Sequence, residues 1–247
     1  MRVKDKVVFI TGGSTGLGLA TAKLYHREGA KVAILGRRAD VLAAAAADIG
    51  DGVLDVPGDA TDPAQVKAAV DKIVARFGRI DIVVHSAGAN PERKNIEGVT
   101  LEGFRTTYEL NTTSAFVVVQ ESLKAMGQGG AIVLIGSVAG MKGSPNRLAY
   151  ATAKAGMIGM TRQLALTLGP KGIRVNLVAP GLIRTPLTAN LIDSMSNAEM
   201  DRMLSDHPLG CLGDPDDVAY ACLYLGSDES KWVSGISLPV AGGRVTH

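Results

Sequence analysis

The sequence has few cysteines, few aromatic residues and no excess of charge of either sign. Its two cysteines, Cys211 and Cys222, form neither a CxxC pair nor the framework of a disulfide-stabilised domain. The formal net charge is +2 and the basic residues do not gather into a run, so nothing in the charge pattern indicates nucleic-acid binding. No metal site is expected.

Long hydrophobic runs, repeats and proline-rich linkers are also missing. The first apolar run ends at Thr11, which makes it too short for the hydrophobic region of a secretory signal or for a membrane span. The 247 residues are 46% hydrophobic and 20% charged, which is enough to bury a large core. We therefore expect one cytoplasmic domain over residues 1–247, without a membrane partner.

Short apolar segments alternate with helical patterns along most of the chain. The first of these, Val7 to Ile10, is apolar without interruption, which is typical of a strand covered on both faces. The alternation predicts parallel β-α-β units. The predicted strands are 7–10, 31–35, 53–56, 82–85, 131–136, 174–179 and 236–240. Two long helices are predicted over 100–126 and 150–168.

One segment, residues 182–212, interrupts this alternation. It contains Met195, Met200 and Met203 among residues of mixed polarity. The pattern favours a mobile helical lid that covers the substrate site. An ordinary surface helix is the alternative. Its apolar side chains point to a moderately apolar substrate.

A glycine-rich turn, Thr11 to Gly18, connects the first strand to the first helix. Glycines at 12, 16 and 18 allow close backbone approach to a pyrophosphate, and the helix N-terminus supplies N–H donors. No lysine follows the last glycine, so a P-loop is excluded. Residues 12–16 also fit the G-x-S-x-G elbow of a hydrolase with Ser14 as nucleophile, but such an elbow normally follows several strands.

The second strand ends in Gly36-Arg37-Arg38. An acidic residue at this distance from the glycine turn would hold the ribose 2′-hydroxyl of NAD, whereas arginine accommodates the 2′-phosphate of NADP. The acidic residue is missing and two guanidinium groups follow. The pattern favours NADP(H), with Arg37 as the main contact; solvated charges are the alternative.

Tyr150 and Lys154 lie four residues apart at the start of a helical segment and therefore share a helix face. A cation about 5 Å from a phenolate contributes roughly 3 kcal/mol at an effective dielectric near 20. This would lower a tyrosine pKa by about two units, toward the range of a general acid or base. A solvated pair is the alternative.

Three further polar residues lie next to predicted apolar elements. Asn111 falls within the apolar stripe of the helix over 100–126, so its amide must bond either the backbone or a water at a working site. Ser137 follows the fifth strand. His85 ends the fourth, where a packed histidine is a better interpretation than a catalytic one.

The order and spacing of these motifs resemble those of the short-chain dehydrogenase/reductase family over nearly the whole chain. The matching positions are Thr11, Gly12, Gly16 and Gly18 of TGxxxGxG, then Asp59, Asn111, Ser137, Tyr150 and Lys154 of YxxxK, and Pro180, Gly181 and Thr185. One departure is Ser86-Ala87-Gly88 in place of the family's N-A-G. Serine is shorter than asparagine and makes fewer hydrogen bonds, so the end of the fourth strand is expected to have fewer side-chain contacts.

The resemblance implies a single-domain, Rossmann-type α/β fold: a doubly wound, seven-stranded parallel sheet with helices on both faces. It implies hydride transfer between a nicotinamide and a carbonyl or secondary alcohol. Tyr150 would exchange the proton, Ser137 would orient the substrate oxygen, and Lys154 would lower the tyrosine pKa and bind the ribose. Asn111 would hold a water that links Lys154 to solvent.

The same resemblance implies contacts with NADP(H), or with NAD(H) as the other possible cofactor. The expected residues are Gly12, Ser14, Thr15, Gly16, Leu17, Gly18, Arg37, Arg38, Asp59, Ala60, Ser86, Ala87, Gly88, Tyr150, Lys154, Pro180, Gly181, Ile183 and Thr185. It also implies a homotetramer packed through the helices at 100–126 and 150–168.

Other functions remain open at this point. One is an NAD-dependent dehydrogenase of a secondary alcohol or polyol. Another is a 3-oxoacyl-carrier-protein reductase, in which Arg93, Lys94 and Arg147 would meet acidic phosphopantetheine. A third is a sensor or scaffold that binds the cofactor without turnover, although such a protein would not need Ser137, Tyr150 and Lys154 together.

Overall fold

A single seven-stranded parallel sheet forms the centre of the molecule. The computed structural model describes residues 1–245, and its strands are paired in the order β3-β2-β1-β4-β5-β6-β7. Their bounds are β1 Val7–Thr11, β2 Lys31–Gly36, β3 Leu54–Pro57, β4 Ile82–His85, β5 Gly130–Ile135, β6 Ile173–Pro180 and β7 Ser237–Val240. The predicted doubly wound sheet, with its seven strands, is confirmed.

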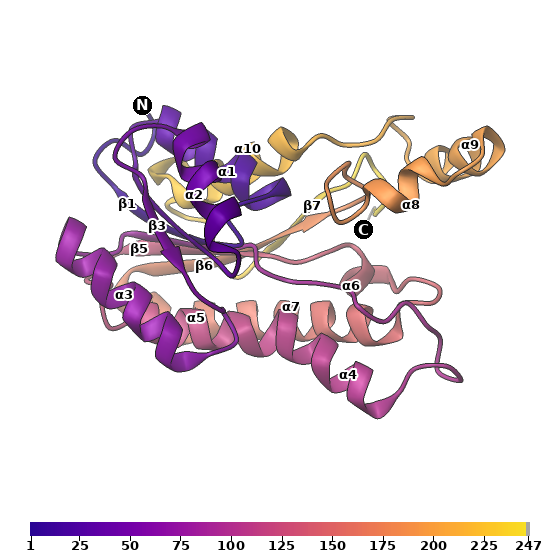
Figure 1. The fold of residues 1–247 in the computed structure, drawn as a ribbon, viewed down its shortest axis with the longest axis horizontal. Helices are drawn as coiled ribbons and strands as arrows, with labels where there is room; N and C mark the ends of the chain where they lie inside the picture. The colour runs from indigo at the N-terminus through magenta and orange to yellow at the C-terminus, as the bar shows by residue number, and fades with distance from the viewer. Residues whose placement is uncertain (246–247) are drawn as a thin grey trace.

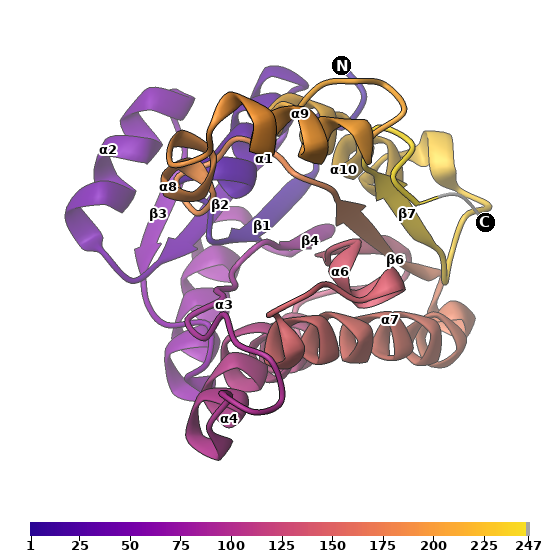
Figure 2. The same ribbon diagram turned by 90° about the vertical axis from the view of Figure 1, so that its right-hand side faces the viewer.

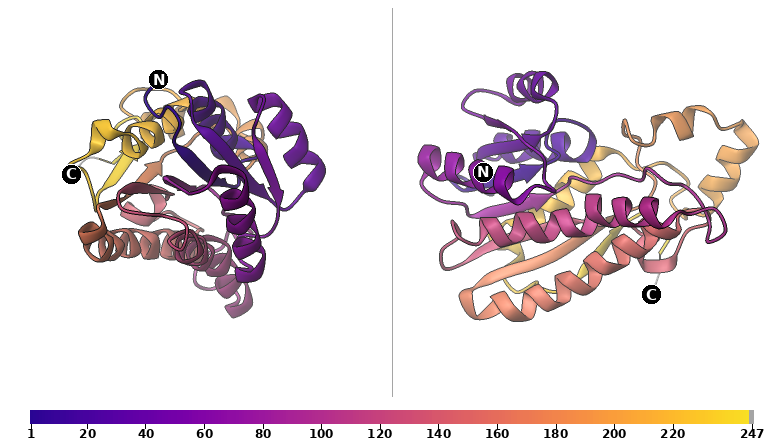
Figure 3. Two further views of the ribbon diagram at one scale, coloured as in Figure 1. Left: turned by 90° about the vertical axis from the view of Figure 1, so that its left-hand side faces the viewer. Right: turned by 60° about the horizontal axis from the view of Figure 1, so that its bottom comes forward.

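Helices cover both faces of this sheet (Figure 1). One layer consists of α1 Gly16–Arg27, α2 Ala39–Ile49 and α10 Pro215–Gly226. The other consists of α3 Pro63–Phe77, α4 Leu101–Tyr108, α5 Ser114–Ser122 and α7 Leu148–Leu168. Viewed along the sheet, as in Figure 2 and on the left of Figure 3, the two layers enclose the strands from opposite sides.

The uninterrupted apolar strands follow from this two-sided cover. Successive side chains of a strand point to opposite faces, so Val7 and Phe9 pack in the core under α3, α5 and α7, while Val8 and Ile10 pack under α1, α2 and α10. All four are at most 1% exposed. Both faces therefore require apolar residues, and no alternation appears in the sequence.

The helix predicted over 100–126 is not continuous. Between α4 and α5 lies a π-helical segment, η1, at Glu109–Thr113, and α5 ends at Ser122. The prediction of one continuous helix was wrong. A π-helical turn adds one residue to a helix, and the spacing of apolar residues in the sequence does not reveal such an insertion. A π-helical turn often marks a functional site, and η1 contains Asn111.

Residues 182–212 form two short helices, α8 Ala189–Asp193 and α9 Asn197–Ser205, that project from the body of the molecule at one end (Figure 1). A capping box begins α9, in which the Ser196 hydroxyl accepts from the Glu199 amide while the Glu199 carboxylate accepts from the Ser196 amide. In residues 1–245, no helix combines the length and apolar character needed to cross a membrane.

The strand order reverses between β1 and β4. The chain leaves β1 for β2 and β3 on one side, and continues from β4 to β7 on the other. Helices therefore diverge from this point, and a crevice opens beyond the carboxyl ends of β1 and β4. The residues that follow these two strands are the glycine turn and Ser86-Ala87-Gly88.

Candidate active site

The glycine turn after β1 packs directly against the residues after β4. Gly12 has a φ of +67°, and a Cβ on it would lie 2.9 Å from the Ala87 nitrogen. A Cβ on Gly18 would collide with the Gly12 carbonyl oxygen. Only glycine permits both approaches. Gly18 therefore serves to pack the start of α1 onto the turn, as close helix packing in such a fingerprint requires.

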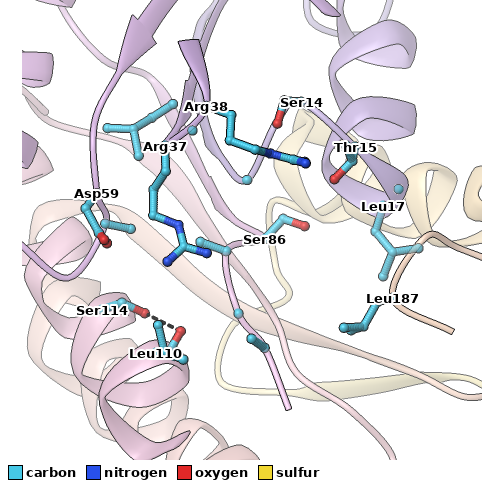
Figure 4. Close-up of a pocket in the computed structure, with 18 of the residues that line it drawn as sticks. Ser14, Thr15, Leu17, Arg37, Arg38, Asp59, Ser86, Leu110, Ser114 and Leu187 are labelled. Atoms are coloured by element: carbon cyan, nitrogen blue, oxygen red, sulfur yellow. Dashed lines mark hydrogen bonds between the residues drawn. The ribbon is translucent and has the colours of Figure 1, made fainter. Parts of the chain in front are cut away.

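A cavity of about 370 Å³ opens over this turn at the carboxyl edge of the sheet (Figure 4). It contains most of the expected cofactor residues, which are Gly12, Ser14, Thr15, Gly16, Leu17, Arg37, Arg38, Asp59, Ala60, Ser86, Ala87, Gly88 and Thr185. The expected residues outside its lining are Gly18, Tyr150, Lys154, Pro180, Gly181 and Ile183. The cavity corresponds in place to the nucleotide end of the predicted site.

Two of these outer residues are held by packing near the carboxyl end of β6. Ile183 is 4% exposed and pairs with Gly213 in an isolated bridge. The Gly181 amide donates to the Val240 carbonyl at 2.9 Å, and a Cβ on Gly181 would lie 2.9 Å from the Ala241 Cα. The segment after β6 is therefore fixed against the end of β7.

Arg37 and Arg38 reach into the cavity in different directions. In Figure 4 the Arg37 side chain extends toward Asp59 and Ser86, while the Arg38 side chain extends toward Ser14 and Thr15. Within residues 1–245, neither guanidinium forms an ion pair. Both charges are thus available for an anion at the end of β2.

Asp59 is held in its place by the turn that follows it. Its Oδ1 accepts from the Thr61 amide and from the Thr61 hydroxyl, each at 2.9 Å. Gln65 in α3 also accepts from the Asp59 amide at 3.0 Å. The carboxylate therefore has a fixed position in the cavity wall.

Tyr150 and Lys154 share one face of α7, as their spacing predicts. The Lys154 Nζ lies 5.6 Å from the centre of the Tyr150 ring. Lys154 is 4% exposed, and its ammonium donates to the Ile135 carbonyl at the end of β5 at 2.9 Å. Ser137 lies just beyond β5, and its hydroxyl accepts from the Ala139 amide at 3.1 Å. Three of the four predicted catalytic side chains, Ser137, Tyr150 and Lys154, thus lie together where β5 ends against α7.

The electrostatics of this group differ from the expectation in one respect. Burial raises the pKa of Tyr150 above its usual value, and the opposing influences are the Ser137 hydroxyl and the charges of Arg147 and Arg93. Burial also lowers the pKa of Lys154 to about 7. The expected lowering of the phenol pKa by Lys154 was therefore wrong here, because a lysine that is itself desolvated is charged only in part near neutral pH.

Asn111 makes the backbone contacts that a buried amide requires and has one atom left over. Its Nδ2 donates to the Ala89 carbonyl at 2.7 Å and to the Thr107 carbonyl at 2.8 Å. Among the described residues its buried Oδ1 has no hydrogen-bond partner. A Cβ placed on Gly88 would lie 2.6 Å from this oxygen and 3.5 Å from the Lys154 Nζ. Asn111 and Lys154 therefore approach the same point beside Gly88.

His85 is a packed residue, as the sequence indicates. It is fully buried, with Nδ1 2.9 Å from the Thr11 hydroxyl and Nε2 3.3 Å from the Ser114 hydroxyl. Burial lowers its pKa to about 3, so the ring is neutral. It joins the ends of β1 and β4 to α5. These contacts fix the strand end immediately before Ser86.

Ser14 does not have the surroundings of a hydrolytic nucleophile. Its side chain lies in the cavity wall, and within residues 1–245 no histidine is hydrogen-bonded to it. A serine nucleophile needs such a base. The elbow interpretation therefore has no geometric support.

Several residues of the cavity wall were not expected from the sequence, namely Leu35, Gly36, Gly58, Thr61, Leu110 and Ser114. The cavity is also lined by Ala89, which follows Gly88, and by Pro186 and Leu187 of the expected lid segment. Leu110 and Ser114 come from η1 and the start of α5, where apolar spacing alone marks them as core. Of the basic residues expected near the site, Lys94 pairs with Glu92 at 3.4 Å, whereas the charges of Arg93 and Arg147 act on Tyr150.

The chain is similar to known proteins over almost its whole length. The family model described as Enoyl-(Acyl carrier protein) reductase matches residues 12–244. The chain is 37% identical to a 3-oxoacyl-[acyl-carrier-protein] reductase of Thermotoga maritima, over 99% of the chain and 100% of the relative. It is 38% identical to an NADP-dependent (R)-specific alcohol dehydrogenase of Lentilactobacillus kefiri, over 98% and 97% respectively.

Solved structures include close matches to the whole fold. One is a short-chain type dehydrogenase/reductase from Mycobacterium ulcerans, which superposes with a TM-score of 0.93 at 32% sequence identity. The match covers 99% of this chain and 91% of that protein.

Proposed function

Since the chain belongs to the short-chain dehydrogenase/reductase family of NAD(P)-dependent oxidoreductases, we propose that it transfers hydride between NADP(H) and a carbonyl compound or secondary alcohol. The observation that carries the proposal is the convergence of Ser137, Tyr150 and Lys154 at the end of β5, next to a cavity over the glycine turn. A dinucleotide held at that turn would supply the hydride, and Tyr150 would exchange the proton with the substrate oxygen.

The residues present fit a dinucleotide. The glycine turn leaves no room for a Cβ at Gly12 or Gly18, and the start of α1 supplies backbone N–H groups for the pyrophosphate. Arg37 and Arg38 would hold the 2′-phosphate, Asp59 the adenine, and Pro180, Gly181, Ile183 and Thr185 the nicotinamide end. The cofactor would supply the hydride when bound, and the protein would orient the substrate and the cofactor and set the pKa values of the acid–base groups.

In the reductive direction Tyr150 donates its proton to the carbonyl oxygen. Its raised pKa keeps the phenol protonated at neutral pH, as a proton donor must be. Ser137 positions the same oxygen through its hydroxyl. Lys154 would bind the ribose, and the free Oδ1 of Asn111 would hold a water through which the lysine and the tyrosine recover protons.

The proposal is tested by following NADPH absorbance with a panel of ketones and aldehydes, and NADP⁺ reduction with secondary alcohols. We expect turnover with members of the panel. Binding of the cofactor without turnover of any substrate would favour the sensor or scaffold instead. The segment 182–212, whose Leu187 lines the cavity, would act as the lid over these substrates.

Replacing Arg37 with alanine should raise the KM for NADPH far more than the KM for NADH. A hydrogen bond to a charged group contributes about 1.5–3 kcal/mol, which corresponds to roughly 10- to 150-fold. The Michaelis constants for the two cofactors measure the effect, with Arg38→Ala as the neighbouring comparison. Equal changes for both cofactors would contradict the NADP(H) preference and favour the NAD-dependent alternative.

We also propose a homotetramer. Large apolar side chains are exposed on the helices expected to meet, with Phe116 on α5 at 50% and Leu166 on α7 at 76%, and Trp232 near β7 is 97% exposed. Burial of such side chains between subunits is favourable. Light scattering should give about four times the mass of the chain, and a monomer would contradict the proposal.

A further inference from the structure

Three arginines from distant parts of the sequence lie within electrostatic reach of one another near Tyr150. Arg93 lies in the loop after β4, Arg147 immediately precedes α7, and Arg244 follows β7. The charges of Arg93 and Arg244 both act on the Arg147 guanidinium. Those of Arg147 and Arg93 also reach the Tyr150 phenol. This group is distinct from the cavity over the glycine turn, whose lining includes none of the three arginines.

The backbone around Arg147 is built to hold it at this place. The preceding residue, Asn146, has a φ of +54°, a left-handed conformation that asparagine tolerates better than most residues. The next residue, Leu148, donates its amide to the Lys94 carbonyl at 3.3 Å. The loop that carries Arg93 is thereby tied to the start of α7. The Arg93 guanidinium also donates to the Leu187 carbonyl at 3.4 Å.

Neighbouring acids balance only part of the positive charge of this group. Arg244 lies 3.6 Å from Asp206, whose carboxylate is 61% exposed. Glu92, next to Arg93 in the sequence, pairs with Lys94. Within residues 1–245, Arg93 and Arg147 form no ion pair, and the partly buried Arg147 side chain makes no hydrogen bond.

A guanidinium in this position is unfavourable on its own account. Burial and the like charges of Arg93 and Arg244 lower the pKa of Arg147, yet arginine stays charged in proteins at neutral pH. A desolvated cation without a counter-charge costs free energy, and an anion brought into the group recovers it. The planar guanidinium matches a carboxylate with two parallel hydrogen bonds.

We propose that Arg147, assisted by Arg93, binds a carboxylate on the substrate itself, a few bonds from the carbon that gains or loses hydride. The proposal rests on the proposed function and names its substrate class: oxo acids and the corresponding hydroxy acids. Arg147 precedes Tyr150 by three residues, about one helical turn, so the anion it holds must be close to the reacting carbonyl.

This closeness favours a small acid over a carrier-protein substrate. In phosphopantetheine a long arm separates the phosphate from the thioester and the reacting carbonyl. An anion at that distance would lie at the rim of the site, well beyond the first turn of α7. The cofactor phosphates would be held by the glycine turn and by Arg37, which line the cavity, whereas Arg147 is not part of its lining.

The test compares matched pairs of substrates that differ only in charge. Oxo acids with the carboxylate two to five bonds from the ketone, both open-chain and cyclic, are each assayed beside the methyl ester. We expect kcat/KM for at least one acid to exceed that of its ester by 10-fold or more. The difference should come from a lower KM for the acid. Arg147→Ala should reduce this acid-to-ester ratio at least 10-fold, and Arg147→Lys should retain part of it.

Arg27→Ala is the matched control. Arg27 is an exposed arginine in the last turn of α1, without an ion pair within residues 1–245, and its loss should leave the ratio unchanged. Esters equal to or better than every acid would overturn the proposal, as would an equal loss of acid and ester turnover in Arg147→Ala. A preference confined to carrier-protein thioesters would also overturn it.

A binding measurement keeps this result separate from failure of the proposed function. In the presence of NADP⁺, an unreactive carboxylate such as cyclohexanecarboxylate should raise the melting temperature of the wild type but not that of Arg147→Ala. The methyl ester of this carboxylate should not raise the melting temperature of either protein. Turnover of esters without an acid preference refutes only the carboxylate site. Absence of all turnover with this shift intact refutes only the hydride-transfer reaction.

Discussion

Tyr150→Phe is expected to lower kcat/KM for carbonyl reduction by about 10²- to 10⁴-fold, the usual contribution of a positioned general acid. The substitution removes only the phenol oxygen and leaves the ring to pack against Lys154, whose Nζ lies 5.6 Å from the ring centre. Cofactor binding should therefore be nearly retained. Single-turnover absorbance at saturating NADPH separates the loss of the chemical step from any loss of binding.

The exposed Tyr220 on α10 provides the control, since Tyr220→Phe removes the same oxygen far from the site. Its activity should equal that of the wild type. In the wild type, the rate of alcohol oxidation should rise with pH through the alkaline range, because the phenolate accepts the proton and the phenol pKa is raised. Tyr150→Phe should lose this rise; an unchanged rate in the variant would exclude Tyr150 as the acid.

The second large effect is expected from Lys154→Met, which removes the ammonium from a nearly isosteric side chain. Catalysis and cofactor binding should decline together, since the lysine lies next to Tyr150 and is proposed to bind the ribose. We expect kcat/KM to decrease by roughly 10²-fold or more, within the range of acid–base contributions, along with weaker NADPH binding in fluorescence titrations. A fall in kcat with unchanged NADPH affinity would contradict the ribose role.

The same variant should be more stable than the wild type at low pH. Lys154 is protonated in the unfolded chain below its ordinary pKa of 10.5, whereas burial lowers its folded pKa to about 7. The unfolded state binds more protons between these values, so wild-type stability rises with pH across this window. The penalty of the buried charge is fully present below about pH 7 and disappears toward pH 10.5.

Denaturant unfolding of both proteins at pH 6.5 and pH 10 measures this change. The stability of Lys154→Met relative to the wild type should be greater at pH 6.5 than at pH 10. The Lys154 Nζ donates to the Ile135 carbonyl as an ammonium at pH 6.5 and as a neutral amine at pH 10, and the resulting difference in hydrogen-bond strength is already contained in the folded pKa of Lys154. A relative stability that does not change with pH would show that Lys154 is not desolvated in the folded protein.

The sheet and the close packing of the glycine turn were predictable because the strand pattern and backbone sterics determine them. Val7 to Ile10 can be apolar at every position only where both faces are covered, and Gly12 and Gly18 have no alternative where backbone meets backbone. The spacing of Tyr150 and Lys154 on one helix likewise fixes their common face. In each case, the decisive neighbours are close in sequence or are imposed by the strand pattern.

Features that depend on distant segments were not predictable. The charges that act on the Tyr150 phenol are those of Arg93 and Arg147, which are more than fifty residues apart in the chain. The pKa values of Tyr150 and Lys154 depend on how deeply the surrounding elements bury them. The contacts of His85 with Thr11 and Ser114 likewise require three separate elements to be assembled.

The π-helical segment at Glu109–Thr113 has a consequence for any change in chain length there. An ideal α-helix turns by about 100° per residue, so deleting one residue would restore regular hydrogen bonding but rotate α5 against α4 by about that angle. Val118 would then leave the core, or Asn111 would turn away from Lys154. The extra residue in η1 thus fixes the rotation of α5 relative to α4. With this rotation, Val118 on α5 packs against the sheet while the Asn111 amide lies beside Lys154.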